Sequence, residues 1–331
     1  MSAQLTSPSD NVVNFEVVLA DGRIVNANKN QNKDLWVALR GSSCNLGLVT
    51  RFDMRAVPYA DPARPLIYGG VINYDLNKES NVIGTYIDFV DEYANTDFLS
   101  SATIWSQYDS GTDETRLNVR LINTANINNS SAHSGFFDFG GINSSTLRSD
   151  SLRNHTIGVA GGDALYNVWF TNSYAHDERI LTRAEEMHRQ LVHDITEAIP
   201  QGDYFFTRAE YQPITSAMIN NGIGGGNVLG LERHTDRGSG LLFLVYVGMA
   251  DAENEEIIVP IARKFLVDLD AYATSLGSNW NWQFLPYANG LQDPISTYGD
   301  EAINTLKKAS RKYDPRGVFQ KLKSAGFKIP A

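Results

Sequence analysis

Ionisable and aromatic side chains gather in or beside segments that the sequence predicts as β-strands. A carboxylate or a phenol in such a place can act as a general acid or base when burial or a charged partner shifts its pKa. The sequence alone does not determine which of these side chains face a cavity, and a packing role remains the alternative for each. The residues concerned are Trp105, Tyr108, Trp169, Tyr174, His176, Glu210 and Tyr211.

A glycine-rich run at residues 222–227 superficially resembles a phosphate-binding loop. It reads Gly-Ile-Gly-Gly-Gly-Asn, without the Lys-Ser/Thr and helix that follow in a P-loop, so we interpret it as a loop or a bulge. Cys44 is the only cysteine, which excludes an intrachain disulfide and a cysteine metal cluster, and we predict no metal site. His188 and His193 lie on a predicted helix among charged neighbours, where we expect both in solvent.

Residues 11–58 contain the most ordered pattern of elements. A β-rich run at 12–19, an Ala-Asp-Gly turn at 20–22 and a return strand at 23–27 predict a hairpin. Asn32 is a candidate cap for a short helix that carries Leu35, Trp36 and Leu39 on one side and ends at Gly41. A strand follows over 46–57 and stops at Pro58.

The following region alternates strands with long amphipathic helices. Strands are predicted over 66–74, 101–108, 115–122, 168–174, 203–210 and 240–248, and helices over 77–94, 177–199, 251–276 and 300–313. Residues 126–151 are rich in Ser, Asn and Gly and read mostly as loop. The pattern predicts the α+β class, with an antiparallel sheet covered by helices on one face.

The composition is that of an ordinary globular protein. The chain has 331 residues, of which 42% are hydrophobic and 20% charged, and its net charge of −10 argues against nucleic acid and anionic membranes as partners. No apolar run approaches the length of a membrane span, and no basic region with an apolar core follows Met1. We therefore expect a cytoplasmic location for this chain.

Dense motif matches at both ends make the sequence resemble one enzyme family. The first runs from Asp10 to Phe52 and includes DNVVN, EVVLADG and DLWVALRG, followed by NLGLVTRF. The second comprises QDP with Tyr298-Gly299, then KYDP and GVFQ. These segments resemble the berberine-bridge-enzyme-like FAD-linked oxidoreductases of the vanillyl-alcohol oxidase and p-cresol methylhydroxylase superfamily. Matches at 212–213 and 225–231 extend the resemblance to nearly the whole chain.

The resemblance implies two domains and a flavin. Residues 1–58 and 286–331 would be the remnant of a PCMH-type FAD-binding α+β domain, and residues 59–285 the substrate domain. FAD is the expected cofactor, but the family's covalent-attachment histidine and cysteine find no counterpart here, because the sequence begins after the segment that carries them. The pattern thus lacks the N-terminal half of the FAD domain.

The resemblance also implies roles for particular residues. Gly41, Asn45, Gly47 and Tyr287 match positions near the flavin. Two glycines of the family loop are here Ser42 and Ser43, and a family asparagine is here Pro286; each change weakens the expected flavin contact. On the substrate sheet, the candidate catalytic residues are Glu210, Tyr108 and Tyr174. The candidate substrate-binding residues are Trp105, Trp169, His176 and Tyr211.

Two functions remain open from the sequence. The first is FAD-linked oxidation of a small secondary metabolite, with impaired or absent flavin binding in this chain. The second is a flavin-free protein that binds the metabolite or catalyses a non-redox step such as cyclisation, a pericyclic reaction or isomerisation. Either function takes a small-molecule partner. An edge exposed by the missing half of the FAD domain would also favour a homodimer.

Overall fold

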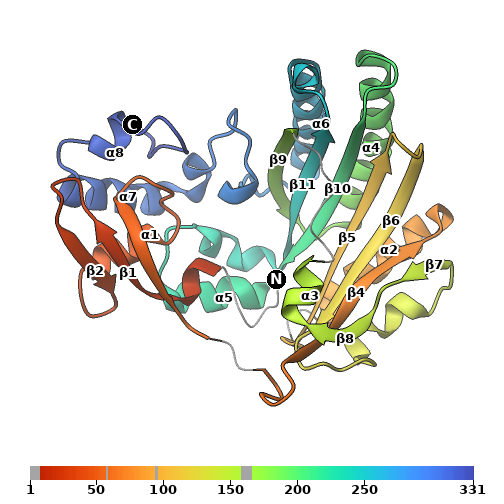
Figure 1. Ribbon diagram of the computed structural model, residues 1–331, viewed down its shortest axis with the longest axis horizontal. Helices are drawn as coiled ribbons and strands as arrows, with labels where there is room; N and C mark the ends of the chain where they lie inside the picture. Colours follow the sequence, from red (N-terminus) through yellow and green to blue (C-terminus); the bar gives the residue numbers. More distant parts are fainter. Residues whose placement is uncertain (1–7, 57–58, 94–95, 158–165) are drawn as a thin grey trace. The chain divides into compact units, whose positions relative to one another are not determined.

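The structure is a computed structural model that describes residues 8–56, 59–93, 96–157 and 166–331 (Figure 1). The chain forms two compact units, which are described separately. The larger unit contains the described residues of 59–215 together with 237–281, and the smaller one contains 8–56, 216–236 and 282–331.

An antiparallel sheet of eight strands forms the frame of the larger unit. Seven strands follow the order β7-β4-β6-β5-β10-β11-β9, and β8 pairs with β4 beside β7. The strands are β4 (Leu66–Tyr74), β5 (Ser100–Asp109), β6 (Glu114–Asn123), β7 (Ile142–Ser145), β8 (Arg148–Ser151), β9 (Tyr166–Ala175), β10 (Phe205–Ile214) and β11 (Gly240–Met249). Residues 126–151, expected mostly as loop, supply β7 and β8.

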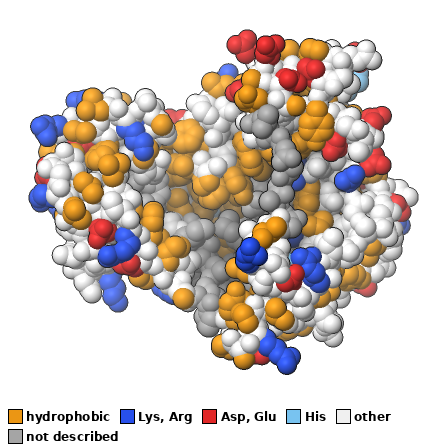
Figure 2. All heavy atoms as spheres, viewed as in Figure 1, with side chains coloured by type: hydrophobic (Ala, Val, Ile, Leu, Met, Phe, Trp, Pro, Cys, Tyr) orange, Lys and Arg blue, Asp and Glu red, His pale blue; other side chains and the backbone are white. Residues whose placement is uncertain are grey.

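Three helices pack on one face of this sheet: α2 (Glu79–Asp88), α4 (Glu178–Ala198) and α6 (Glu255–Ser275). Their apolar sides and the inward side chains of the strands form one continuous buried core. The short helix α3 (Leu152–Ile157) packs against β4 and β8. Acidic residues precede and begin α6, and Figure 2 shows acidic side chains gathered near the upper end of this unit. The predicted α+β sheet with covering helices is confirmed.

Alternation along β10 divides the side chains between the two faces of the sheet. Phe205, Ala209 and Tyr211 belong to the core under the helices. Arg208 and Glu210 alternate with them and therefore lie on the other face of the sheet, away from α2, α4 and α6. This second face is called the opposite face below. Register pairing extends this opposite face across the sheet to Trp105, Gln107, Asn118, Arg120, Trp169, Gln212, Leu242, Leu244 and Tyr246.

The smaller unit is built on a three-stranded sheet of order β2-β1-β3, comprising β1 (Val12–Val18), β2 (Ile24–Asn28) and β3 (Leu48–Met54). The predicted hairpin is confirmed, and Gly22 in its turn has φ +84°. The unit's helices are α1 (Lys33–Leu39), α5 (Ser216–Gly225), α7 (Asp300–Tyr313) and α8 (Val318–Lys321).

Two local predictions in this unit are wrong. Asn32 precedes α1, but its backbone is left-handed and its side chain donates to the carbonyl of Asn26 at 2.8 Å, so it does not cap the helix. The glycine-rich run expected as a loop or bulge lies partly in α5, which ends at Gly225, although glycine has a low helix propensity.

Residues 216–236 associate with the smaller unit, whereas the sequence analysis assigned them to the substrate domain. Long-range hydrogen bonds hold them there. Arg40 donates to the carbonyl of Gly226 at 2.8 Å, and the indole of Trp282 donates to the carbonyl of Leu229 at 2.7 Å. A Cβ at Gly230 would lie 1.8 Å from the carbonyl oxygen of Tyr298, so only glycine permits that approach.

Candidate functional site

Glu210 is the carboxylate on the opposite face of the large sheet. Its side chain is almost buried, with the residue 7% exposed. Gln212 donates to one carboxylate oxygen at 2.8 Å, and Arg208 approaches the other at 3.4 Å. All three residues come from β10 at alternate positions, so the strand itself aligns them. Two donors at the two oxygens fix the orientation of a carboxylate that could exchange a proton with a bound molecule.

Trp105 is the register partner of Glu210 on β5. The guanidinium groups of Arg120 and Arg208 each lie 5.2 Å from its ring centroid, within range of a cation–π interaction. Gln107 accepts two hydrogen bonds from Arg208, at 2.8 and 3.2 Å. The Arg208 side chain is therefore fixed by Gln107, Glu210 and the indole ring together.

An aromatic stack lies on the same face. The rings of Trp169 and Tyr246 stack with their centroids 4.2 Å apart, and Phe206 meets Tyr246 edge-on at 5.0 Å. Tyr246 is the register partner of Arg208 on β11. The structure thus brings Glu210, Trp105 and Trp169 to one face of the sheet. Polar side chains surround Glu210 on β5 and β10, and aromatic side chains stack on β9 and β11.

Three other candidates lie on the helix-covered side. Tyr174 is fully buried and donates to Asp270 at 2.7 Å, and Tyr211 donates to Glu185 at 2.9 Å. Burial raises the pKa of both phenols, and a neighbouring carboxylate raises each further. The Nε2 atom of His176 lies 3.0 Å from the carbonyl oxygen of Ile87. These side chains complete hydrogen bonds of the core, and we leave them out of the proposed site.

Tyr108 also lies on the helix-covered side of the sheet, where its register partner on β10 is Thr207. Its hydroxyl donates to Asp113 at 2.9 Å, and its ring packs near Phe205. It lines a surface pocket of about 520 Å³ at the end of the sheet, together with Tyr204. Tyr108 and Glu210 therefore occupy different surfaces of the unit.

Sequence reasoning missed Arg208, Gln212, Gln107, Arg120 and Tyr246. A signal for the first two was available, because residues two places before and after Glu210 share its face on any strand. The other three depend on strand pairing and register, which no local pattern in this sequence specifies.

His188 corrects another expectation. It is buried, with its Nε2 atom 2.8 Å from the hydroxyl of Thr207, and burial lowers its pKa to about 4. Its helix position places it with Ala184 and Leu191 on the side that faces the sheet, whereas His193 is exposed as expected. Its charged neighbours Glu186 and Arg189 are exposed, whereas Glu185 is buried on the same side of α4 as His188.

The candidate flavin loop at residues 41–47 is filled by protein. Gly41 has φ +134°, and a Cβ there would lie 3.0 Å from the side chains of Val228 and Leu229. A Cβ on Gly47 would lie 2.4 Å from Val17. Both glycines are therefore explained by close packing within the smaller unit. Ser43 keeps the left-handed conformation, with φ +55°, that the glycine of the family pattern would adopt readily.

The side chain of Asn45 is also fully used. It donates to the carbonyls of Ser42 and Phe327, at 2.7 and 2.8 Å, and accepts from Gln320 at 2.8 Å. Tyr287 is half-buried against Phe284, next to exposed Pro286. All four candidate cofactor residues are thus engaged in internal contacts. They do not fit a flavin cradle, and we derive no chemical step through FAD.

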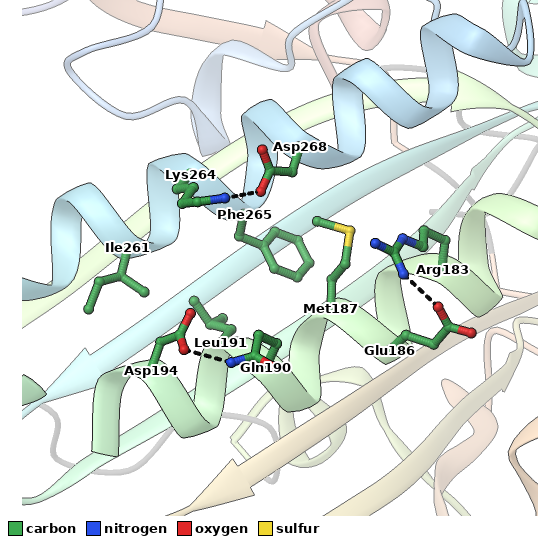
Figure 3. Close-up of a pocket in the computed structure, with 10 residues that line it drawn as sticks. All are labelled: Arg183, Glu186, Met187, Gln190, Leu191, Asp194, Ile261, Lys264, Phe265 and Asp268. Atoms are coloured by element: carbon green, nitrogen blue, oxygen red, sulfur yellow. Dashed lines mark hydrogen bonds and ion pairs between the residues drawn. The ribbon is translucent and has the colours of Figure 1, made fainter. Parts of the chain in front are cut away.

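Other pockets carry less chemistry. Figure 3 shows a groove of about 260 Å³ between α4 and α6, into which Met187, Leu191 and Phe265 project. Its charged groups pair with one another, Arg183 with Glu186 and Lys264 with Asp268. In the smaller unit, a pocket of about 890 Å³ is lined by residues of β1 and α1 and by four basic side chains, Lys29, Lys33, Arg40 and Arg55.

Across 8–56, 59–93, 96–157 and 166–331, no three His, Cys, Asp or Glu side chains gather as a metal site requires. In those same ranges, every helix is too short or too polar to cross a bilayer.

Comparison with solved structures identifies the class of fold. The chain superposes on 6-hydroxy-D-nicotine oxidase from Arthrobacter nicotinovorans with a TM-score of 0.67 at 16% identity, covering 97% of this chain and 66% of the other. It superposes on BBE-like 1 of Physcomitrella patens with a TM-score of 0.65 at 15% identity, covering 97% and 66%. The fold is that of the FAD-linked oxidases.

Sequence comparison finds related proteins. No family model matches. Over 99% of its length the chain is 31% identical to the FAD-dependent monooxygenase drtC of Aspergillus calidoustus, of which it covers 61%. The sequence is thus similar to FAD-dependent monooxygenases, and its fold matches that of a berberine-bridge-enzyme-like protein, in line with the resemblance of its motifs. It spans 61% and 64% of the length of two curated fungal relatives, the FAD-dependent monooxygenases drtC and sdcF.

Proposed function

We propose that this chain binds a small organic secondary metabolite on the opposite face of its large sheet and exchanges a proton with it through Glu210. The observation that carries the proposal is the nearly buried Glu210 carboxylate, which Gln212 and Arg208 orient from the same strand. A positioned carboxylate accelerates proton transfer by roughly 10²–10⁴-fold.

The neighbouring side chains support this role. Trp169 and Tyr246 provide a flat aromatic surface on one side of Glu210, and Leu244 is its apolar register partner on β11. Trp105 and Arg208 provide hydrogen-bond donors and charge on the other side. A metabolite with an apolar body and one acidic position would lie across both, and Glu210 would take the proton from that position.

A probe with an exchangeable methyl group tests this function. Acetonaphthone combines an aromatic body with a ketone, and its methyl group takes up deuterium from heavy water through the enol. The wild-type chain should accelerate this uptake, followed by NMR, and Glu210→Gln should lose about 100-fold of the acceleration. Glu256→Gln, on the exposed first turn of α6, is the control that should retain it. Equal rates with and without wild-type protein would reject the proposal.

FAD-dependent oxidation of the same metabolite is the second candidate. The similarity to an FAD-dependent monooxygenase favours it, whereas the filled loop at residues 41–47 argues against flavin binding through that segment. Absorbance spectra of the purified chain before and after FAD addition separate the two candidates. A flavin band that stays with the protein after gel filtration supports oxidation; a colourless protein that still accelerates deuterium uptake supports the non-redox function.

A further inference from the structure

The indole N–H of Trp105 is a buried donor without a partner among the described residues. Trp105 is 5% exposed, and no acceptor lies within hydrogen-bonding distance of its Nε1 atom. Leaving a buried donor unpaired costs about 1–3 kcal/mol, so folded proteins rarely retain one. A ligand atom that accepts this hydrogen bond would account for its presence on the face that carries Glu210.

The charges around Trp105 indicate what kind of acceptor would bind there. Arg120 and Arg208 approach the ring from the strands on either side of β5. Arg120 also lines a pocket of about 140 Å³. The lining of that pocket includes two arginines and a histidine but no carboxylate, and it does not include Trp105. A negatively charged oxygen is therefore favoured over a neutral one.

We propose that the sheet face at Trp105 and Arg120 binds an acidic oxygen of the substrate, such as a carboxylate or a phenolate. The oxygen accepts a hydrogen bond from the Trp105 indole and lies beside the Arg120 guanidinium. This inference rests on the proposed function, because it names the substrate class of the same sheet face. The substrate is then a flat apolar metabolite with an acidic group at one end.

Strand pairing brings Trp105 and Glu210 close together. They are register partners on adjacent strands, whose backbones lie about 4.8 Å apart. One flat molecule on this face can therefore contact both side chains.

Binding of two matched probes tests the inference. Naphthoate carries the ring and the anionic oxygens, and methylnaphthalene carries the ring alone. Trp105→Phe removes the N–H but keeps an aromatic ring, and should weaken naphthoate binding about tenfold while changing methylnaphthalene binding by less than about threefold. Arg120→Met should weaken naphthoate selectively as well. Trp169→Phe, on β9 of the same face, should affect the two probes equally.

A second measurement detects binding in the wild-type chain itself. In the wild-type chain labelled at its five tryptophans, one indole N–H resonance should move downfield on naphthoate addition and stay in place with methylnaphthalene. The Trp105→Phe spectrum assigns that resonance. A wild-type chain that does not prefer naphthoate, or equal losses for both probes in Trp105→Phe, would overturn the inference.

The binding and exchange experiments together distinguish failure of the proposed anion site from failure of proton transfer by Glu210. Glu210→Gln removes a negative charge near the proposed anion site, so it should retain or strengthen naphthoate binding while it loses the acceleration of deuterium uptake. Selective naphthoate binding without acceleration of deuterium uptake would keep the anion site and reject the proton transfer. Deuterium uptake without naphthoate selectivity would do the reverse.

Discussion

Glu210 and Tyr211 are neighbours in sequence but lie on opposite faces of the same strand. Glu210 is oriented by Arg208 and Gln212 on a face that carries an unpaired indole donor. Tyr211 lies under α4, where it donates to Glu185 and receives a hydrogen bond at its carbonyl from Tyr86. A buried polar side chain on this strand is therefore not by itself evidence of a ligand-binding site. On the helix-covered face Tyr211 and Glu185 pair with each other, whereas on the opposite face the Trp105 indole keeps a donor without a partner among the described residues.

The largest expected effect is on the stability of the helix-covered face. Phe243 is fully buried and packs its ring against Tyr211 and Phe265. Phe243→Ala should lower the free energy of unfolding by about 3–5 kcal/mol, because it leaves a cavity under the helices. Tyr246→Ala, on the opposite face and half-buried, should cost clearly less. Urea unfolding of both variants measures the difference, and equal losses would mean that the two faces are packed alike.

The next effect is a pair of opposing pH dependences on α4. Burial raises the pKa of Glu185 to about 7 from 4.5, although Ser106 and Tyr211 donate to it. The folded state therefore keeps a proton that the unfolded chain loses, and stability falls as the pH rises from about 4.5 to about 7. Burial lowers the pKa of His188 to about 4 from 6.5, so stability falls as the pH drops from about 6.5 to about 4.

Single substitutions separate these two slopes. In Glu185→Gln, stability should rise with pH between about 4 and 6.5 more steeply than in wild type, by up to about 1.4 kcal/mol per pH unit. In His188→Gln, stability should fall more steeply between about 4.5 and 7. Urea titrations across this range measure both. Glu79 and Arg189 lie near Glu185 and modify the slopes, and parallel curves for wild type and both variants would contradict the assignments.

The smallest expected effect concerns Tyr174. Tyr174→Phe removes the hydrogen bond to Asp270, which keeps its bond from Asn172, and should cost about 1–2 kcal/mol of stability. Deuterium uptake by acetonaphthone should stay within about twofold of wild type. A loss of uptake comparable to that of Glu210→Gln would place Tyr174 in the catalytic machinery and end the division between the two faces.

The motifs at both ends of the chain indicated the family that it resembles, and hydrophobic periodicity determined the long helices. The predicted helices over 177–199 and 251–276 correspond to α4 and α6, and the strand predicted over 66–74 is β4. These elements are encoded locally, because apolar spacing and chain punctuation specify them within one segment. The position of His188 on the buried side of α4 was equally available from its spacing to Ala184 and Leu191.

Only the tertiary structure showed which candidate residues lie on the same face of the large sheet. Alternation along a strand sorts Glu210 from Tyr211, but the face that helices cover depends on how α2, α4 and α6 pack across the sheet. The grouping of Trp105, Arg120 and Arg208 depends on the pairing of β5 with β6 and β10. The filling of Gly41 and Gly47 depends on Val228 and Val17, which lie far away in sequence. Such long-range contacts depend on pairing and packing between segments, which local sequence patterns do not specify.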